Sequence, residues 1–149
     1  GLDIRGLISS AEAAASGRGR LIEMAADDMF SPPASGSFRH SGMAIAPCSM
    51  GTAGRIASGV SDGLITRAAD VCLKERRPLI LIVRETPLSV IHLRNLTALA
   101  EAGATVMPAC PAFYHNPANI EEAVDTVINR ALHHLGLTDT GAREWQAGS

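Results

Sequence analysis

The unbroken apolar run Leu79–Val83 is the feature of the sequence that most constrains how the chain can fold. Five consecutive apolar residues between charged or turn-forming neighbours are typical of a β-strand that is buried on both faces of a sheet. Short apolar runs at residues 42–48 and 104–110 predict two more strands. Because helical patterns separate these strands, we predict an α/β fold with a parallel sheet that is covered on both faces. The predicted helices span residues 49–59, 64–76, 87–103 and 118–136.

The length of the chain, 149 residues, suits one domain with its own core. We expect residues 1–149 to form that single domain, with residues 137–149 as a C-terminal extension. Three strands make a small sheet for a doubly wound fold, and the chain begins with Gly1 rather than Met. We therefore expect this to be a partial domain, with the leading strands of the fold absent from the sequence.

Composition argues against several kinds of partner. The formal net charge of −2 gives no electrostatic reason to expect nucleic acid or an anionic membrane surface. No apolar run reaches the roughly 18 residues that a membrane-spanning helix needs. The three cysteines are an odd number without metal-type spacing, as is typical of reduced thiols inside the cell. We therefore predict a cytoplasmic protein that needs no metal.

Three segments, "CSMGT", "RETP" and "PACPAFYH", follow the predicted strands, at the edge of the sheet where open α/β proteins bind ligands. The first, "CSMGT", places Ser49, Gly51 and Thr52 at the start of a helix. Free backbone N–H groups, two hydroxyls and the positive end of the helix dipole suit a phosphate. The same residues also fit a plain helix N-cap with small side chains. The sequence leaves both interpretations open.

The second segment, "RETP", places Arg84 and Glu85 directly after the buried run. Charge at a buried strand end is costly unless it is paired, which favours a functional pair. Arg84 would hold an anion, and Glu85 would accept a proton or position a polar group. Thr86 is a candidate N-cap for a helix that begins at Pro87.

Other candidate residues also have simpler explanations. Lys74, Arg76 and Arg77 crowd at the end of a predicted helix, where the dipole favours cations without any ligand. Lys74 is a candidate to point inward. Tyr114, the only tyrosine, lies in a loop bounded by prolines, and Arg130 lies in the middle of the last predicted helix, where exposure to solvent is the ordinary outcome.

Together and in this order, these segments resemble the UbiX-like flavin prenyltransferases. The likeness rests on "SGS" at 35–37, "PCSMGT" at 47–52, "LKERRPL" at 73–79, "RETP" at 84–87 and "FYH" at 113–115. The resemblance implies a Rossmann-like (flavodoxin-like) α/β fold that binds FMN, apparently truncated here at its N-terminus. The wider superfamily also includes flavin-dependent decarboxylases that act on cysteine-type substrates.

The resemblance also implies a reaction. A dimethylallyl group would pass from dimethylallyl monophosphate to N5 and C6 of FMN, without a metal. The prenylated FMN would then serve a UbiD-type decarboxylase. The resemblance implies a large homo-oligomer, a dodecamer, whose sites are built across subunits.

Each role in the family transfers to a residue at the matching position of this chain. FMN would be bound by Ser49, Met50, Gly51, Thr52 and Arg67. The substrate phosphate would be held by Lys74, Arg84, Tyr114 and Arg130. Glu85 would manage protons during the transfer, while Lys74 and Arg84 stabilise the leaving phosphate.

The N-terminal part of the family pattern is absent from this sequence. Family members begin with a strand and a phosphate loop of the "GASGA" kind, followed by a second strand and an acidic residue, and the chain shows none of these. Three expectations therefore stay open. The chain is a prenyltransferase, an FMN-dependent cysteine-type decarboxylase of the same superfamily, or an inactive FMN-binding fragment.

Overall fold

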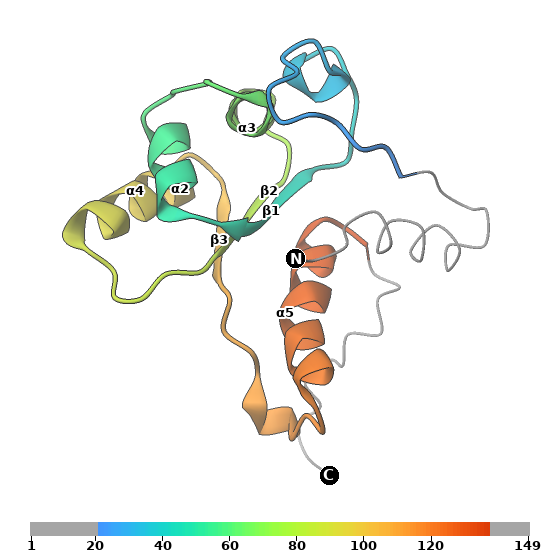
Figure 1. Ribbon diagram of the computed structural model, residues 1–149, viewed down its shortest axis with the longest axis vertical. Helices are drawn as coiled ribbons and strands as arrows, with labels where there is room; N and C mark the ends of the chain where they lie inside the picture. The colour runs from blue at the N-terminus through green and yellow to red at the C-terminus, as the bar shows by residue number, and fades with distance from the viewer. Residues whose placement is uncertain (1–20, 138–149) are drawn as a thin grey trace.

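The computed structural model describes residues 21–137, which form a parallel sheet with helices on both faces (Figure 1). In this part of the chain the sheet has three strands, β1 (Met43–Cys48), β2 (Leu79–Val83) and β3 (Thr105–Pro108), in the order β1-β2-β3. Both neighbouring pairs are parallel. The predicted α/β fold class is thus confirmed. The predicted extension at 137–149 lies, apart from Leu137, outside the described residues.

Four α-helices and two short 3-10 helices surround the described sheet. The α-helices are α2 (Met50–Ala57), α3 (Leu64–Lys74), α4 (Val90–Glu101) and α5 (Ile120–His134). The 3-10 helices are η1 (Pro32–Ala34) and η2 (Phe113–His115). Figure 1 shows α2, α3 and α4 on one side of the sheet and α5 on the other.

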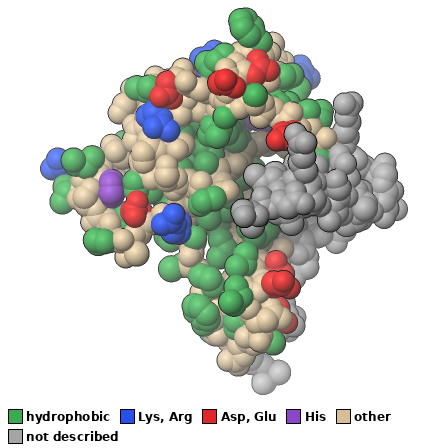
Figure 2. Space-filling model, in the orientation of Figure 1, with side chains coloured by type: hydrophobic (Ala, Val, Ile, Leu, Met, Phe, Trp, Pro, Cys, Tyr) green, Lys and Arg blue, Asp and Glu red, His purple; other side chains and the backbone are tan. Residues whose placement is uncertain are grey.

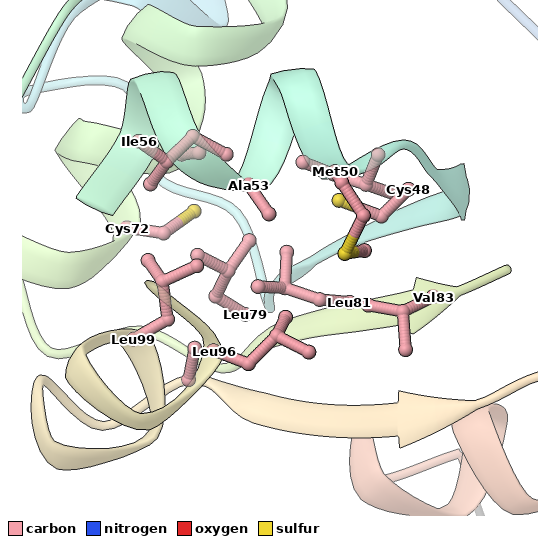
Figure 3. Close-up of a cluster of buried hydrophobic side chains, with 13 residues drawn as sticks. Cys48, Met50, Ala53, Ile56, Cys72, Leu79, Leu81, Val83, Leu96 and Leu99 are labelled. Atoms are coloured by element: carbon pink, nitrogen blue, oxygen red, sulfur yellow. The ribbon is translucent and has the colours of Figure 1, made fainter. Parts of the chain in front are cut away.

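Strand β2 is buried on both faces, as its unbroken apolar sequence predicts. Leu79, Leu81 and Val83 point into a cluster shared with β1, α2, α3 and α4 (Figure 3). Ile80 and Ile82 point to the opposite face, where they meet α5. Alternate side chains of a strand face opposite sides of a sheet, so a central strand between two helical layers must be apolar throughout.

Helix α4 begins three residues later than the sequence prediction, at Val90 rather than Pro87. The N-cap is Ser89, whose hydroxyl accepts a hydrogen bond from the His92 backbone N–H at 3.2 Å. The ring Nδ1 of His92 in turn accepts from the Ser89 N–H at 3.3 Å. The prediction that Thr86 caps this helix is therefore wrong, because a reciprocal pair of bonds fixes the start at Ser89.

Helix α5 buries only part of the apolar stripe that its sequence predicts, which runs through Ile120, Val124, Val127, Ile128, Ala131 and Leu135. Ile120, Val124 and Ile128, which the sequence pattern assigns to the core, are 82%, 46% and 38% exposed. The buried residues of α5 are Ala123, Val127 and Ala131. Only Val127 and Ala131 join the cluster on this face of β2, so the helix contacts the sheet mainly through its second half.

Two kinds of feature are absent from the described residues. None of the helices between residues 21 and 137 has the length and apolar character needed to cross a membrane. The same residues contain no group of three or more His, Cys, Asp or Glu side chains that could hold a metal ion.

Candidate active site

The carboxyl ends of the parallel strands meet at one edge of the sheet, which we call the carboxyl edge. Cys48 of β1 lies opposite Val83 of β2 there, after a register shift between Ile45 and Cys48, and Val83 lies opposite Pro108 of β3. Three segments leave the sheet at this edge, beginning at Ser49, Arg84 and Ala109. Ligands of open α/β sheets bind at this edge, so the fold brings two of the predicted segments, "CSMGT" and "RETP", to one place.

The start of α2 offers a set of hydrogen-bonding groups at the carboxyl edge. Ser49 is the N-cap, as predicted, and its Oγ accepts from the Thr52 N–H at 3.2 Å. The Ser49 and Thr52 hydroxyls lie 3.0 Å apart. The N–H groups of Met50 and Gly51, in the first turn, have no partner within the helix. These donors, together with the helix dipole, suit the polar atoms of a ligand.

Space is open above this helix start. A Cβ atom built on Gly51 would come no closer than 3.8 Å to any neighbour, the nearest being Arg55 Nη1. The side chain of Met50 points the other way, into the core, and is only 6% exposed (Figure 3). Any contact of Met50 with a ligand at this edge therefore falls to its backbone amide.

Arg55 is a further residue at this edge that sequence reasoning missed. Its Nη2 approaches the Thr52 hydroxyl at 3.5 Å, and its Nε lies 3.4 Å from Asp62 Oδ1. The spacing of Thr52 and Arg55, three residues apart on one helix, was the available signal. Arg55 thus connects the start of α2 to the turn before α3.

Arg84 and Glu85 follow β2 at the carboxyl edge, and both side chains are exposed. The argument that a buried strand end would make their charges costly is therefore wrong, since burial ends at Val83. Glu85 Oε1 accepts a hydrogen bond from the Thr86 N–H at 3.2 Å. Within residues 21–137, Arg84 makes no hydrogen bond or ion pair. Both charged groups are accessible to a ligand.

Lys74 lies at the opposite end of β2. It ends helix α3, and a four-residue turn, 75–78, connects that helix to the first residue of β2. At about 3.3 Å per residue, the strand separates Lys74 from Arg84 by on the order of 15 Å. The Lys74 ammonium is paired with the Glu75 carboxylate, and this contact lowers the pKa of Glu75 below its usual range. One chain therefore does not bring Lys74 and Arg84 together.

The other three predicted site residues lie on separate elements. Arg67, half-buried in α3, donates from Nε to the Ala34 carbonyl at 3.0 Å and pairs with Asp70 at 3.0 Å. Tyr114, in η2, is 73% exposed. Arg130, in α5, is also exposed, as the simpler sequence interpretation expected. Arg67, Tyr114 and Arg130 therefore lie on three different elements of one chain.

A pocket of ≈ 430 Å³ lies between η2 and the start of α5. Its lining comprises Phe113, Asn116, Pro117, Asn119, Ile120 and Ala123. None of the predicted site residues lines this pocket, although Tyr114 directly follows Phe113. We therefore centre the candidate site on the carboxyl edge and not on this pocket.

The surface does not carry a concentrated basic patch on the face shown in Figure 2. Lys and Arg side chains are scattered there among acidic and apolar ones. This distribution agrees with the net charge of −2.

The comparisons with known proteins agree with the geometry. Residues 20–132 match the model of the family described as Flavoprotein. A flavin prenyltransferase UbiX of Synechocystis sp. is 50% identical over 130 residues, which cover 87% of this chain and 63% of that protein. The crystal structure of AnUbiX (PadA1), in complex with FMN and dimethylallyl pyrophosphate, superposes with a TM-score of 0.81 at 43% identity. It covers 93% of this chain and 79% of that one.

The chain belongs to the Flavoprotein family, among its UbiX-like members. This confirms the family resemblance of the sequence. A dodecameric FMN-dependent UbiX-like decarboxylase from Escherichia coli O157:H7 is also similar, with a TM-score of 0.78 and 47% identity. The match covers 82% of this chain and 66% of that one. The chain spans about three fifths of the length of the curated relatives it matches.

Proposed function

We propose that this chain carries the flavin prenyltransferase function of its UbiX-like relatives. The observation that carries the proposal is the likeness to AnUbiX, whose structure holds both FMN and dimethylallyl pyrophosphate. The identity of 50% to a named flavin prenyltransferase supports the same activity. The alternatives, a cysteine-type decarboxylase and an FMN-binding chain without turnover, become outcomes of the test below.

FMN would lie along the carboxyl edge, against the start of α2. The Ser49 and Thr52 hydroxyls and the N–H groups of Met50 and Gly51 are the donors available to its polar atoms. The open space over Gly51 allows a flat ring to approach the backbone closely. Arg67 would add a cation, although its Nε is already engaged by the Ala34 carbonyl.

The substrate phosphate would be held by Lys74, Arg84, Tyr114 and Arg130. Cations and a phenol hydroxyl stabilise a leaving phosphate by charge and hydrogen bonding, without a metal ion. Lys74 and Arg84 lie at opposite ends of β2, on the order of 15 Å apart along the strand, and the described residues do not show them sharing one ligand. We therefore propose that the site is completed between copies of the chain in a homo-oligomer, as large as the dodecamer of the similar decarboxylase.

FMN, when bound, supplies N5 and C6 as the two atoms that accept the five-carbon group. A bond from N5 to the allylic carbon would form as the bond from that carbon to the phosphate oxygen breaks, and the phosphate would leave with the bonding electron pair. A second bond, from C6 to the far end of the allylic double bond, would require a proton added to that double bond and a proton lost from C6 of the flavin ring. Glu85 is exposed at the carboxyl edge and is held only by the Thr86 N–H, so it is free to accept that proton.

The product would be prenylated FMN for a UbiD-type decarboxylase. We place this activity in the cytoplasm, on the argument from the cysteines: Cys48, Cys72 and Cys110 are all free thiols.

A direct test uses purified protein with reduced FMN and dimethylallyl monophosphate. We expect the extracted flavin to gain the mass of one dimethylallyl unit, measured by mass spectrometry, only when protein and both compounds are present. If FMN binds but stays unmodified, the prenyltransferase proposal is wrong. A parallel reaction with a peptide that ends in cysteine tests the decarboxylase alternative by loss of carbon dioxide from the peptide.

A further inference from the structure

Two arginines from the α3 region hold the loop at residues 34–38. Arg77 donates from Nη2 to the Gly36 carbonyl and from Nη1 to the Phe38 carbonyl, both at 2.7 Å. Arg67 donates from Nε to the Ala34 carbonyl at 3.0 Å. Three alternate carbonyls of one loop thus accept bonds from guanidinium groups. A planar guanidinium can bind two acceptors at once, which an ammonium group cannot do with the same geometry.

The backbone at the end of α3 aims Arg77 at this loop. Arg76 adopts the left-handed conformation, with φ of 54°, and its N–H bonds the Leu73 carbonyl at 3.2 Å. The Arg77 N–H then bonds the Cys72 carbonyl at 2.8 Å. These two bonds form a Schellman motif, which reverses the chain sharply after a helix. Arg77 is half-buried as a result, whereas the neighbouring Arg76 is exposed.

The backbone of this loop lies against the Lys74 ammonium. A Cβ atom built on Gly36 would lie 2.7 Å from Lys74 Nζ and 2.6 Å from Glu75 Oε1. The ammonium therefore rests directly against the Gly36 backbone, with the Glu75 carboxylate as its ion-pair partner. Residue 36 must be glycine for this arrangement, because any side chain would displace both charged groups.

We propose that Arg77 is a positioning residue for Lys74. By fixing the Gly36 and Phe38 carbonyls, Arg77 holds the loop against the Lys74 ammonium and restricts the rotamers of that long side chain. An ammonium that is already oriented binds an anion with a smaller loss of conformational entropy. The inference rests on the proposed function, in which Lys74 holds the phosphate of dimethylallyl monophosphate.

The test compares Arg77→Lys with the matched control Arg76→Lys in the full chain. Between residues 21 and 137, Arg76 has no side-chain hydrogen bond or ion pair, so its replacement controls for the loss of a guanidinium group nearby. We expect Arg77→Lys to raise KM for dimethylallyl monophosphate about tenfold, the effect of losing one charge-assisted hydrogen bond. FMN affinity and kcat should change less than about twofold, and Arg76→Lys should match the wild type.

Two results would overturn the inference while the proposed function stands. In one, Arg77→Lys has the KM of the wild type. In the other, KM rises while FMN affinity and thermal stability both fall, which indicates a role in the fold alone. If the wild type binds FMN but transfers no dimethylallyl group, the proposed function fails first, and this inference fails with it.

Two further measurements keep the inference testable if Arg77→Lys folds poorly. Gly36→Ala leaves Arg77 intact but pushes the Lys74 ammonium aside, so it should raise the same KM without weakening FMN binding. Hydrogen exchange needs no substrate: Arg77→Lys should speed amide exchange in residues 34–38, and Arg76→Lys should not. Unchanged KM in Gly36→Ala, or unchanged exchange in Arg77→Lys, contradicts the proposal.

Discussion

The two ends of strand β2 carry charged residues in opposite circumstances. At its carboxyl end, Arg84 and Glu85 are exposed, and the Arg84 side chain makes no ion pair or hydrogen bond with any described residue. Before its amino end, Lys74 is paired with Glu75, and Arg77 bonds two carbonyls that lie 41 and 39 residues away in the sequence. The first group makes few contacts within the chain, and the second is already held by contacts within it.

This difference separates two kinds of functional contribution. A charged group without a protein partner can change its protonation or its ligand without disturbing the fold. A charged group that holds backbone carbonyls fixes the shape around it and acts through its neighbours. Substitutions at the carboxyl end should therefore change chemistry, whereas substitutions near the amino end should change stability and positioning.

The largest effect is expected from Glu85→Gln. The amide cannot accept the proton lost from the flavin ring, so the rate of prenyl transfer should fall by about 100-fold or more. FMN affinity and thermal stability should stay close to those of the wild type, because Glu85 contacts only the Thr86 N–H. The measurements are the transfer rate by mass spectrometry and FMN binding by fluorescence quenching. An equal loss of FMN binding would assign Glu85 to the fold instead.

A pair of matched substitutions, Arg77→Gln and Arg84→Gln, tests the contrast in stability directly. Arg77→Gln removes two charge-assisted hydrogen bonds from a half-buried position and should cost about 2 kcal/mol of unfolding free energy. Arg84→Gln should change that free energy by less than about 0.5 kcal/mol, since the side chain is exposed. Urea unfolding measures both. An equal loss of unfolding free energy in the two variants would contradict the contrast between the two ends of β2.

Arg76→Gly should stabilise the protein by about 1 kcal/mol. Arg76 holds a φ of 54°, a conformation that costs an L-residue with a side chain roughly 1–2 kcal/mol and that glycine adopts freely. The gain is reduced because glycine also gives the unfolded chain more freedom. The midpoint of urea unfolding should rise without a change in the slope. A fall in the midpoint would show that the Arg76 side chain contributes contacts of its own.

The smallest expected effect is on how the stability of the fold depends on pH. The pKa of Glu75 is lowered, first by its hydrogen bond and then by the charge of Lys74, and the pKa of Asp28 is lowered mainly by its hydrogen bond with Ser31. A carboxyl group with a lowered pKa in the folded state stabilises the fold above its usual pKa. That contribution is lost as the pH falls through the folded-state value.

We therefore expect stability to decline as the pH falls below about 5, more steeply in the wild type than in Glu75→Gln. Urea midpoints at a series of pH values measure the slopes. The slope that Asp28 contributes should remain in Glu75→Gln. Identical slopes in the two proteins would mean that the Lys74–Glu75 pair adds nothing to the stability of the fold.

Much of the fold follows from local sequence. The strand Leu79–Val83 has the same bounds in the sequence prediction and in the structure, because five apolar residues in a row fit only a strand between two helical layers. Ser49 caps α2 as expected, since capping depends on residues three positions apart. The charges of Arg84 and Glu85 at the carboxyl edge follow from the direction of a parallel strand.

The predictions that failed depend on surroundings that local patterns do not encode. The helix periodicity of α5 could not show that its first half extends past the sheet and leaves Ile120 exposed. The buried character of β2 suggested a buried charge pair at Arg84 and Glu85, but the chain reaches solvent as soon as the strand ends. Burial depends on which elements cover a residue, and that is decided by tertiary packing.

By itself, the sequence determined the order of strands and helices, the parallel sheet and the residues that reach its carboxyl edge. Only the tertiary structure decided that Arg77 holds the loop at Gly36 and Phe38. Strands and helices follow from interactions between residues a few positions apart. The hold of Arg77 on the loop joins residues about forty positions apart, and such contacts exist only after the chain has folded.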